Sequence, residues 1–403
     1  MKLKIIEREE IQCPICGHDR FETAYEKKFI VIMNDEHYIW PTTQVICKKC
    51  GMVFTNPQPV NSVLEMYYST TYNYYGEISP TPRIQQFNFM KKHIPSKFKR
   101  VLEVGAFNGY FLNILRDNGY EVHGIEPSRI GVEQAKNKFG INIENRFFDE
   151  EYVESFVNKK KKQFDIVCFF HVLEHIKRPL EFLKLVKKVS REDGYIFLEV
   201  PDAERPLVNN VADFFSIEHI NHFTEMSLKN LANLLGLNII AFDKPKEISV
   251  IRVIYRKIDN KTSNTKIENN FSNMKKIMKE YKEDKNLFIE KIKDRLHNYD
   301  KIVVYGAGMH TSQLVTQGLL DLNKVEYIID SNEAKWGKDF LGFKISPPDI
   351  LNKINLPVLI SSYDSQNKIS EYLSLKFPNI HQIKLYDKVK SYNAGFEEKE
   401  VGL

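Results

Sequence analysis

Four cysteines near the N-terminus form two pairs with the same short spacing. The two segments are CPICG at residues 13–17 and CKKCG at residues 47–51. A Cys-x-x-Cys turn places both thiolates on one side of the chain, and the glycine that follows permits a positive φ. Four thiolates form the tetrahedral set that zinc takes in structural sites, with no open position for a reacting molecule. The sequence therefore predicts a structural zinc site whose ligands are Cys13, Cys16, Cys47 and Cys50.

The alternatives to zinc are a redox dithiol or a fortuitous pairing. The 30 residues between the pairs exceed the separation of about 15–20 that is commonest in such sites. The N-terminus lacks the apolar stretch of an export signal, so we expect a reducing, cytoplasmic location in which thiolates bind metal rather than form disulfides. The chain holds no run of about 18 apolar residues, so no membrane-spanning helix is expected.

A second informative group lies where an apolar run that predicts a buried strand turns into a helix. Residues 103–109 read EVGAFNG, and the next predicted strand ends at Glu126. Glycines in such a turn admit a ligand close to the backbone, and an acid after the next strand suits ribose hydroxyls. The spacing nevertheless differs from the G-x-G-x-x-G fingerprint of dinucleotide-binding folds.

The pattern acid-x-Gly-x-x-x-Gly resembles the first motif of class I S-adenosylmethionine (SAM) methyltransferases. Three later segments extend the resemblance over residues 98–255: FDIVCFF at 164–170, HVLEHI at 171–176 and GYIFLEVP at 194–201. The resemblance implies that a cationic sulfonium and an amino-acid head lie over the glycine turn. Glu103 suits these groups better than it would suit a pyrophosphate.

The same resemblance assigns cofactor contacts. It implies that Gly105, Ala106 and Gly109 admit the cofactor, and Ala106 stands where the family often has glycine. Glu126 would hold both ribose hydroxyls, unless it is a solvent-facing strand end. The predicted third strand is poorly marked, so Phe148 and Asp149 could be structural instead of flanking the adenine. The implied cofactor-binding residues are Glu103, Gly105, Ala106, Phe107, Gly109, Glu126, Phe148, Asp149 and, near the methionine end, His171.

A zinc module, a SAM domain and a second α/β unit together resemble the bacterial sugar C-methyltransferases, which act on nucleotide-linked keto-deoxysugars. That family has a His-Glu-His-Leu-x-Tyr-Phe pattern near the end of its SAM domain, and residues 217–223 here read IEHINHF. Glu218, His219 and Phe223 match this pattern, whereas Ile217 and His222 depart from it. The departures at Ile217 and His222 bear on the catalytic chemistry that the resemblance implies and not on the fold.

The resemblance also implies a base network. A C-methyltransferase needs a base to remove a proton next to a carbonyl, and an O- or N-methyltransferase needs one for a hydroxyl or amine. Histidine serves either case, so we expect His219 to act as the base, supported by Glu218, His175 and His222. The tyrosine that the family places before its SAM domain falls most plausibly on Tyr72. The alternative is that these residues are structural and that the tyrosines between residues 67 and 75 form an aromatic lid.

A second strand, glycine turn and helix start occurs at residues 301–311, and the following strand ends at Asp330. In the resembled family this domain helps to bind the nucleotide-sugar, so Gly306, Gly308 and His310 are expected on the substrate side. A histidine that opens a helix could contact a phosphate. A pure scaffold, or NAD or CoA binding, remains the alternative, and Thr311 replaces the third glycine of the dinucleotide fingerprint.

These motifs divide the chain into segments, and strands alternating with helical patterns predict parallel sheets of the α/β class. The expected organisation is a four-cysteine zinc module at 1–60, a Tyr-rich connector at 61–97 that ends in a helix, a class I methyltransferase Rossmann-like domain at 98–255, a helical linker at 256–298, and a second Rossmann-like domain at 299–403.

The composition indicates a globular protein: 42% of the residues are hydrophobic, 28% are charged, and the net charge is only +5. The leading hypothesis is a SAM-dependent methyltransferase that acts on a nucleotide-linked sugar in bacterial glycan or deoxysugar biosynthesis. The alternatives are O- or N-methylation of another small molecule or glycan, a nucleic-acid-binding zinc protein and an NAD-linked oxidoreductase. Nucleic acid is not expected as a partner, because the cysteine segments carry few aromatic residues or arginines and the charges of the linker are mixed.

Overall fold

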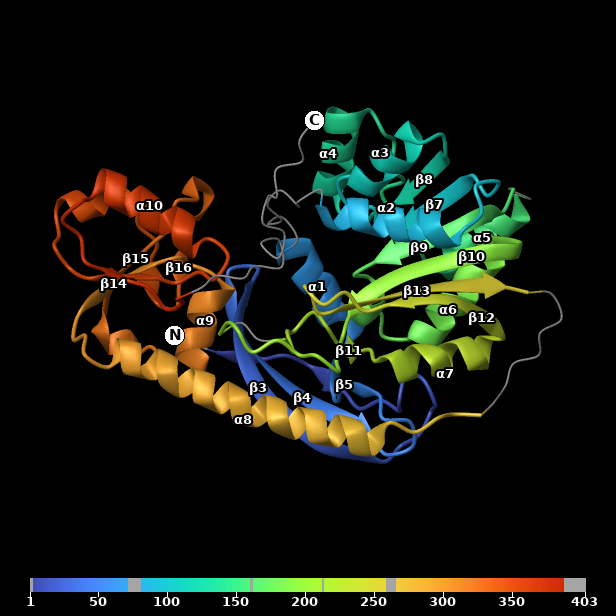
Figure 1. Ribbon diagram of the computed structural model, residues 1–403. Helices are drawn as coiled ribbons and strands as arrows, with labels where there is room; N and C mark the ends of the chain where they lie inside the picture. Colours follow the sequence, from blue (N-terminus) through green and yellow to red (C-terminus); the bar gives the residue numbers. More distant parts are fainter. Residues whose placement is uncertain (1–2, 72–80, 160–161, 212–213, 259–265, 388–403) are drawn as a thin grey trace.

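The computed structural model describes residues 3–71, 81–159, 162–211, 214–258 and 266–387. Within these ranges the chain builds three main sheets (Figure 1). A central six-stranded sheet lies beside a smaller C-terminal sheet of four strands, and an N-terminal sheet lies beneath both, next to the long helix α8.

The central sheet has the strand order β12-β13-β10-β9-β7-β8. Its strands are β7 (Arg100–Val104), β8 (Glu121–Ile125), β9 (Phe164–Phe170), β10 (Ser190–Pro201), β12 (Leu237–Asp243) and β13 (Val250–Lys257). The first four are parallel, and β13 runs antiparallel to both β10 and β12. The poorly marked third strand of the sequence is reduced to a single bridge between Ile125 and Glu144.

Helices cover both faces of the central sheet. On one face lie α2 (Thr81–His93), α3 (Tyr110–Asp117) and α4 (Arg129–Phe139); on the other lie α5 (Glu150–Asn158), α6 (Pro179–Val189) and α7 (Glu225–Leu235). The seven residues of β9 are all buried. A near-continuous apolar run of this kind is typical of a parallel strand that is covered on both faces. The middle of the chain is therefore an α/β domain, as expected.

The N-terminal sheet contains a long hairpin of β3 (Phe21–Met33) and β4 (Glu36–Cys47). Asn34 and Asp35 form its turn with φ of 51° and 60°, the left-handed conformation that tight hairpins use. β1 (Lys4–Ile5) and β5 (Val53–Thr55) also pair with β4, and β2 (Arg8–Glu9) pairs with β6 (Gln58–Pro59).

The last strand of the N-terminal sheet comes from far along the chain. β11 (Asn221–His222) pairs antiparallel with β5, with Asn221 opposite Phe54 and His222 opposite Val53. The amide of Thr55 also donates to the carbonyl of Ile220 at 2.9 Å. The segment expected to carry the base is therefore fixed to the N-terminal module by backbone hydrogen bonds.

The described parts of the connector between the N-terminal sheet and the central domain hold two helices, whereas one was expected. α1 (Asn61–Thr71) packs against β3, and α2 follows at the other end of the connector. Apolar residues of α1, including Val63 and Tyr67, join Trp40 and Phe29 of the hairpin in one cluster. The sequence did not predict α1.

The C-terminal sheet is parallel, with strand order β15-β14-β18-β19. Its strands are β14 (Ile302–Tyr305), β15 (Val325–Ile329), β18 (Val358–Ile360) and β19 (Gln382–Ile383), its helices are α9 (Met309–Thr316) and α10 (Gln366–Lys376), and a short ribbon joins β16 (Asp339–Phe340) to β17 (Phe343–Lys344). The helix α8 (Phe271–Leu296) leads into this sheet from the central domain (Figure 1).

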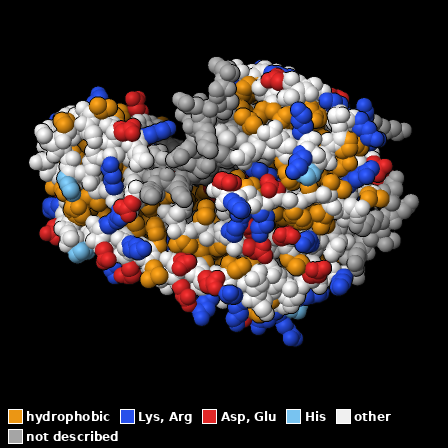
Figure 2. Space-filling model, in the orientation of Figure 1, with side chains coloured by type: hydrophobic (Ala, Val, Ile, Leu, Met, Phe, Trp, Pro, Cys, Tyr) orange, Lys and Arg blue, Asp and Glu red, His pale blue; other side chains and the backbone are white. Residues whose placement is uncertain are grey.

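Lys, Arg, Asp and Glu side chains are intermixed over the face that Figure 2 shows. The described residues of this face therefore form no large area of one sign of charge, in keeping with the near-balanced composition. Among the described residues, no helix has the length and apolar character needed to cross a membrane.

The start of α8 rests on the second cysteine turn. The amide of Asn270 donates to the carbonyl of Cys50 at 3.3 Å, and the side-chain amide of Asn269 donates to the carbonyl of Lys48 at 3.2 Å. Gly51 has a φ of 78°, and a Cβ at this position would lie 2.5 Å from the backbone carbon of Asn270. The cysteine turn therefore needs glycine both for its conformation and for the close approach of α8.

Gly51→Ala should lower the free energy of unfolding more than Gly17→Ala does. Gly17 has a similar φ of 66° after the first cysteine pair, but no atom of the described residues lies within 4 Å of the position that its Cβ would take. We expect Gly17→Ala to cost about 1–2 kcal/mol from left-handed strain and Gly51→Ala to cost about 1–3 kcal/mol more from overpacking. Urea denaturation of both variants measures the difference. Equal losses would contradict the packing of α8 against Gly51.

Candidate active site

The glycine turn after β7 holds the acid of the next strand. Gly105, Phe107 and Gly109 have φ of 73°, 42° and 72°. In this conformation the amide of Phe107 donates to Glu126 Oε2 at 2.8 Å, and the amide of Ser128 donates to Glu126 Oε1 at 2.7 Å. Glu126 is only 4% exposed, so it is not the solvent-facing strand end of the alternative interpretation. Each carboxylate oxygen keeps a further lone pair for a hydroxyl donor.

Glu103 lies on β7 just before the turn and is buried. Among the described residues, no hydrogen-bond partner reaches its Oε2 atom. Burial raises the pKa of this carboxyl to about 8. A buried carboxylate oxygen without a partner, directly beside the glycine turn, fits a ligand that brings a cationic group.

Two further residues expected at the adenine have structural contacts. Phe148 is buried and packs against Tyr152 and Phe182. Asp149 caps α5, where its Oδ1 accepts a hydrogen bond from the amide of Tyr152 at 2.8 Å. The exposed aromatic ring of this loop is Phe147, which is 60% exposed. Adenine contact by Phe148 and Asp149 stays a prediction.

His171 follows β9 with a φ of 56° and connects two buried carboxylates. Its Nδ1 lies 3.2 Å from Glu174 Oε1 and its Nε2 lies 3.1 Å from Glu199 Oε1. Burial alone would lower the pKa of His171, but the hydrogen bonds to Glu174 and Glu199 raise it to about 9. His171 is therefore an imidazolium at neutral pH, and both of its N–H groups donate to carboxylates.

Glu199 is the centre of a charge network that the sequence did not reveal. It lies on β10, is fully buried, and accepts hydrogen bonds from Gln86 of α2 at 2.7 Å and from the guanidinium of Arg252 on β13. Burial alone would raise the pKa of Glu199, but His171 and Arg252 lower it to about 2. The network fixes the turn after β9 to two strands and a helix.

The residues 173–175 form a short 3-10 helix that holds the expected base segment. The amide of Ile220 donates to the carbonyl of Glu174 at 3.0 Å, and His175 Nδ1 lies 3.0 Å from the carbonyl of Glu218. The ring of His219 then packs edge-on against that of His175, with centroids 4.9 Å apart. Glu174, His175 and His219 thus form one group of side chains.

Burial, and next the neighbouring His175, lower the pKa of His219 to about 4. The imidazole of His219 is therefore neutral at pH 7 and can accept a proton. The carboxylates of Glu174 and Glu218 act in the opposite sense, because they favour the charged form. They would stabilise an imidazolium that forms during a reaction.

Helix α1 brings two tyrosines to this group. Tyr67 is buried against Trp40 and donates from its hydroxyl to Glu218 Oε1 at 2.6 Å. The Tyr68 hydroxyl lies 3.4 Å from His175 Nδ1. Tyr72, the tyrosine that the resemblance favoured, lies outside the described residues. The sequence pointed to the tyrosine run but not to these members, because it did not predict α1.

His222 lies on β11 and its contacts are in the N-terminal module and the segment before β11. Its Nε2 is 3.0 Å from Gln44 Oε1, and its ring packs on Phe215 with centroids 4.6 Å apart. Burial lowers the pKa of His222 well below its usual value. Its support of the base stays a prediction.

The four cysteines converge as a metal site requires. Their sulfur atoms lie within 4.8 Å of one another, and the pairs Cys13–Cys50 and Cys16–Cys47 are each 3.6 Å apart. Zn–S bonds of about 2.3 Å in a tetrahedron separate the sulfurs by about 3.8 Å. The geometry of the donor set therefore fits zinc.

In the C-terminal domain, the carboxylate of Asp330 has hydrogen-bond partners in the glycine turn at Gly306 and in a nearby lysine. The amide of Ala307 and the ammonium of Lys335 both donate to Asp330 Oδ2, at 2.9 and 3.0 Å. The ion pair with Lys335 makes Asp330 a poor match for the ribose-binding acid of a dinucleotide site.

His310 is held by partners within its own domain. Its two ring nitrogens lie within hydrogen-bonding distance of the hydroxyls of Ser361 and Tyr386. Tyr386 in turn accepts a hydrogen bond from the amide of Val211 at 3.1 Å. His310 thus connects the glycine turn of this domain to the segment that leads to His219, and direct contact of Gly306, Gly308 or His310 with a substrate stays a prediction.

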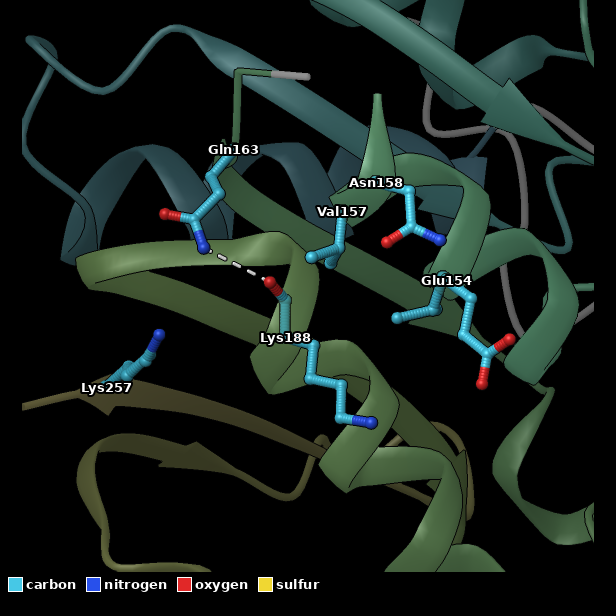
Figure 3. A pocket seen from close by; sticks show the side chains of 7 residues that line it. Glu154, Val157, Asn158, Gln163, Lys188 and Lys257 are labelled. Carbon is cyan, nitrogen blue, oxygen red and sulfur yellow. Dashed lines mark hydrogen bonds between the residues drawn. The ribbon is translucent and has the colours of Figure 1, made fainter. Parts of the chain in front are cut away.

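A pocket of about 470 Å³ lies at the other end of the strands of the central sheet, where β9 begins (Figure 3). Gln163, which precedes β9, donates there to the carbonyl of Lys188 at 3.1 Å. The other lining residues are Val153, Glu154, Val157, Asn158 and Lys257. None of the described residues that are expected at the site lines this pocket, since the candidate site begins where β9 ends.

The family comparison agrees with this geometry. Residues 81–241 match the family described as a methyltransferase domain. The C-methyltransferase NovU of Streptomyces niveus is 24% identical over 250 residues, which are 57% of this chain and 56% of that protein. The mitochondrial ubiquinone biosynthesis O-methyltransferase of Dictyostelium discoideum is 28% identical over 116 residues, which are 26% of this chain and 36% of the relative. The chain thus spans about half or less of the length of these relatives.

A crystal structure of a SAM dependent methyltransferase from Archaeoglobus fulgidus is similar to this chain, with 17% sequence identity and a TM-score of 0.36. The superposition covers 49% of this chain and 99% of the other protein. The assignment of the fold rests on the strand order and the family match. Residues 81–241 are a class I methyltransferase domain of the α/β type. This part of the chain is therefore an enzyme domain of the methyltransferase class.

The stability of the protein should fall as pH rises towards 8, because of Glu103. The pKa of Glu103 is about 8 in the folded chain, and the unfolded reference value is 4.5. The folded state holds this proton more tightly, so its contribution is complete below about pH 4.5 and is lost as pH rises through 8, at about 1.4 kcal/mol per pH unit.

Urea denaturation of wild type and Glu103→Gln at about pH 6 and about pH 7.5 measures this contribution, and the wild type should lose about 2 kcal/mol more than the variant. Glu133→Gln is the matched control, because Glu133 is exposed on α4. Identical pH dependence in wild type and Glu103→Gln would contradict a protonated Glu103.

Proposed function

We propose that the chain transfers a methyl group from SAM to a small acceptor, with His219 as the base. The observation that carries the proposal is the contact between the glycine turn and the turn after β9. A Cβ at Gly105 would lie 2.6 Å from Val172 Cγ2, and Val172 lies between His171 and the Glu174, His175 and His219 group. The donor side and the base side of the site therefore adjoin.

On the donor side, the residues of this chain bind and orient the cofactor. SAM supplies a methyl group on a positively charged sulfur. Glu103 offers its unpartnered oxygen to the cationic part of the ligand, whose positive charge would favour the ionised form of this otherwise protonated carboxyl. Glu126 offers lone pairs to the ribose hydroxyls. The other residues proposed to line this side are Gly105, Ala106, Phe107, Gly109, Phe148, Asp149 and His171.

On the acceptor side, the neutral imidazole of His219 removes a proton from the acceptor. Glu174 and Glu218 favour the imidazolium that results. Tyr67 holds Glu218 through its 2.6 Å hydrogen bond, and His175 orients the segment through the carbonyl of Glu218. The acceptor atom must then lie in line with the methyl group, about 3–3.5 Å away.

We propose a nucleotide-linked sugar as the acceptor. The similarity to C-methyltransferase NovU supports carbon as the methylated atom. Met309, which directly follows the glycine turn of the C-terminal domain, packs against the apolar cluster that contains Ile217, and this proximity supports a substrate that extends from His219 towards that turn. O-methylation of another small molecule is the second candidate, favoured by the similarity to a ubiquinone biosynthesis O-methyltransferase.

His219→Gln should lower methyl transfer by about 10²- to 10⁴-fold, the usual contribution of a general base, and leave SAM binding within about threefold, because His219 lies on the acceptor side. The assay incubates a panel of nucleotide-sugars with isotopically labelled SAM, and mass spectrometry identifies the product. His123→Gln is the matched control, because His123 pairs with exposed Glu121 on β8. Unchanged turnover in His219→Gln would remove His219 from the mechanism.

We also propose that Cys13, Cys16, Cys47 and Cys50 hold one structural zinc ion. The ion would join β4 and the start of α8. Cys47 is the last residue of β4, and the carbonyl of Cys50 accepts a hydrogen bond from the amide of Asn270. Four thiolates leave no position for a substrate, so zinc at this site has no direct part in methyl transfer.

Reduced protein should therefore retain one zinc per chain after dialysis, by metal analysis. Cys50→Ser should lose the metal and lower the melting temperature, because the removed ligand leaves the remaining thiolates without a complete site. Cys168→Ser should retain the zinc, because Cys168 is buried in β9, where its thiol contacts the carbonyl of Leu102. Folded, reduced wild-type protein without zinc would refute the proposal.

A further inference from the structure

A second set of metal-ligating side chains lies apart from the cysteines. Glu174, His175 and His219 each offer a ligand atom, and the three atoms lie within 4.8 Å of one another. Two imidazoles and one carboxylate form a set that zinc and other divalent first-row metals take in proteins, with further positions open. The residues come from the short helix at 173–175 and from the segment before β11.

The hydrogen bond of His175 prepares its ring for a metal. Its Nδ1 lies 3.0 Å from the carbonyl oxygen of Glu218. Because a carbonyl only accepts, Nδ1 carries the hydrogen and Nε2 keeps the lone pair. Metal-binding histidines in proteins are oriented by the same kind of N–H donation to a carbonyl.

Glu174 gives the second, independent observation. Its residue surface is 1% exposed, its Oε1 accepts from His171, and no described residue hydrogen-bonds to its Oε2. Leaving a buried carboxylate oxygen without a partner is costly. A cation bound between Glu174 and the two imidazoles would remove that cost.

The two segments are already held together without a metal. The amide of Ile220 donates to the carbonyl of Glu174, and β11 pairs with β5 directly after this contact. A cation therefore needs little rearrangement of the backbone to bind, and preorganisation favours affinity.

We infer that Glu174, His175 and His219 bind a divalent first-row cation such as Zn²⁺. We further infer that the bound cation prevents His219 from acting as the base. The binding stands on the geometry alone, whereas the blocking rests on the proposed function. A metal takes the lone pair of His219 that would otherwise accept the proton of the acceptor. Zn²⁺ and Ni²⁺ suit this nitrogen-containing set, whereas Mg²⁺, which favours all-oxygen ligands, should bind weakly.

Calorimetric titration with Zn²⁺ tests the binding in full-length protein whose cysteine site already holds its one zinc. Wild type should show one additional site. Glu174→Gln and His219→Gln should each weaken it by at least about tenfold, since each removes a ligand. Glu218→Gln is the matched control, because Glu218 is the adjacent carboxylate but is not part of the group. Circular dichroism shows whether each variant is folded. If Glu174→Gln does not fold, the comparison of wild type with His219→Gln is sufficient to test the site.

The absence of an additional site in wild type, or equal affinity in all variants, would overturn the inference. The titration contains neither SAM nor acceptor, so its result does not depend on the proposed function. If methyl transfer is found, added Zn²⁺ should inhibit it with the affinity of the additional site, and Mg²⁺ should not. Full activity with the additional site occupied would overturn the blocking, and a site that binds Zn²⁺ in a chain without methyl transfer would refute only the proposed function.

Discussion

The pairing of β11 with β5 is the constraint on which the arrangement of the candidate active site depends. The two strands belong to parts of the sequence more than 150 residues apart, and their hydrogen bonds fix the residues just before Asn221. The amide of Ile220 then reaches the carbonyl of Glu174, so the segment with His219 lies between the N-terminal sheet and the turn after β9. The N-terminal module therefore positions the segment that carries the candidate base His219.

Buried charges hold the opposite side of the same site. Glu199 takes hydrogen bonds from His171, Arg252 and Gln86, which come from three different elements. Each charge in the network is costly to bury alone, but together they are paired. The network fixes His171 in a left-handed conformation that a residue other than glycine rarely adopts. It thereby sets the position of the turn that follows, which contacts Gly105 and carries Glu174.

The helix α8 connects the N-terminal module to the C-terminal domain. Its first turn rests against the second cysteine turn, and it ends where the C-terminal domain begins. The C-terminal domain also contacts the central part of the chain, because the Tyr386 hydroxyl accepts a hydrogen bond from the amide of Val211. One continuous helix of 26 residues therefore joins the cysteine turn to the C-terminal domain.

The sequence by itself determined what depends on local pattern. The EVGAFNG turn, the buried strand at 164–170 and the acid at Glu126 are local patterns, and the family resemblance that they carry predicted the α/β methyltransferase domain. Only the tertiary structure decided which side chains meet. Tyr67 and Glu218 are 151 positions apart and Glu199 and Arg252 are 53 apart, so no local period relates them. The helix α1 escaped prediction for the same reason, because it is stabilised by packing on the β3–β4 hairpin rather than by its own sequence.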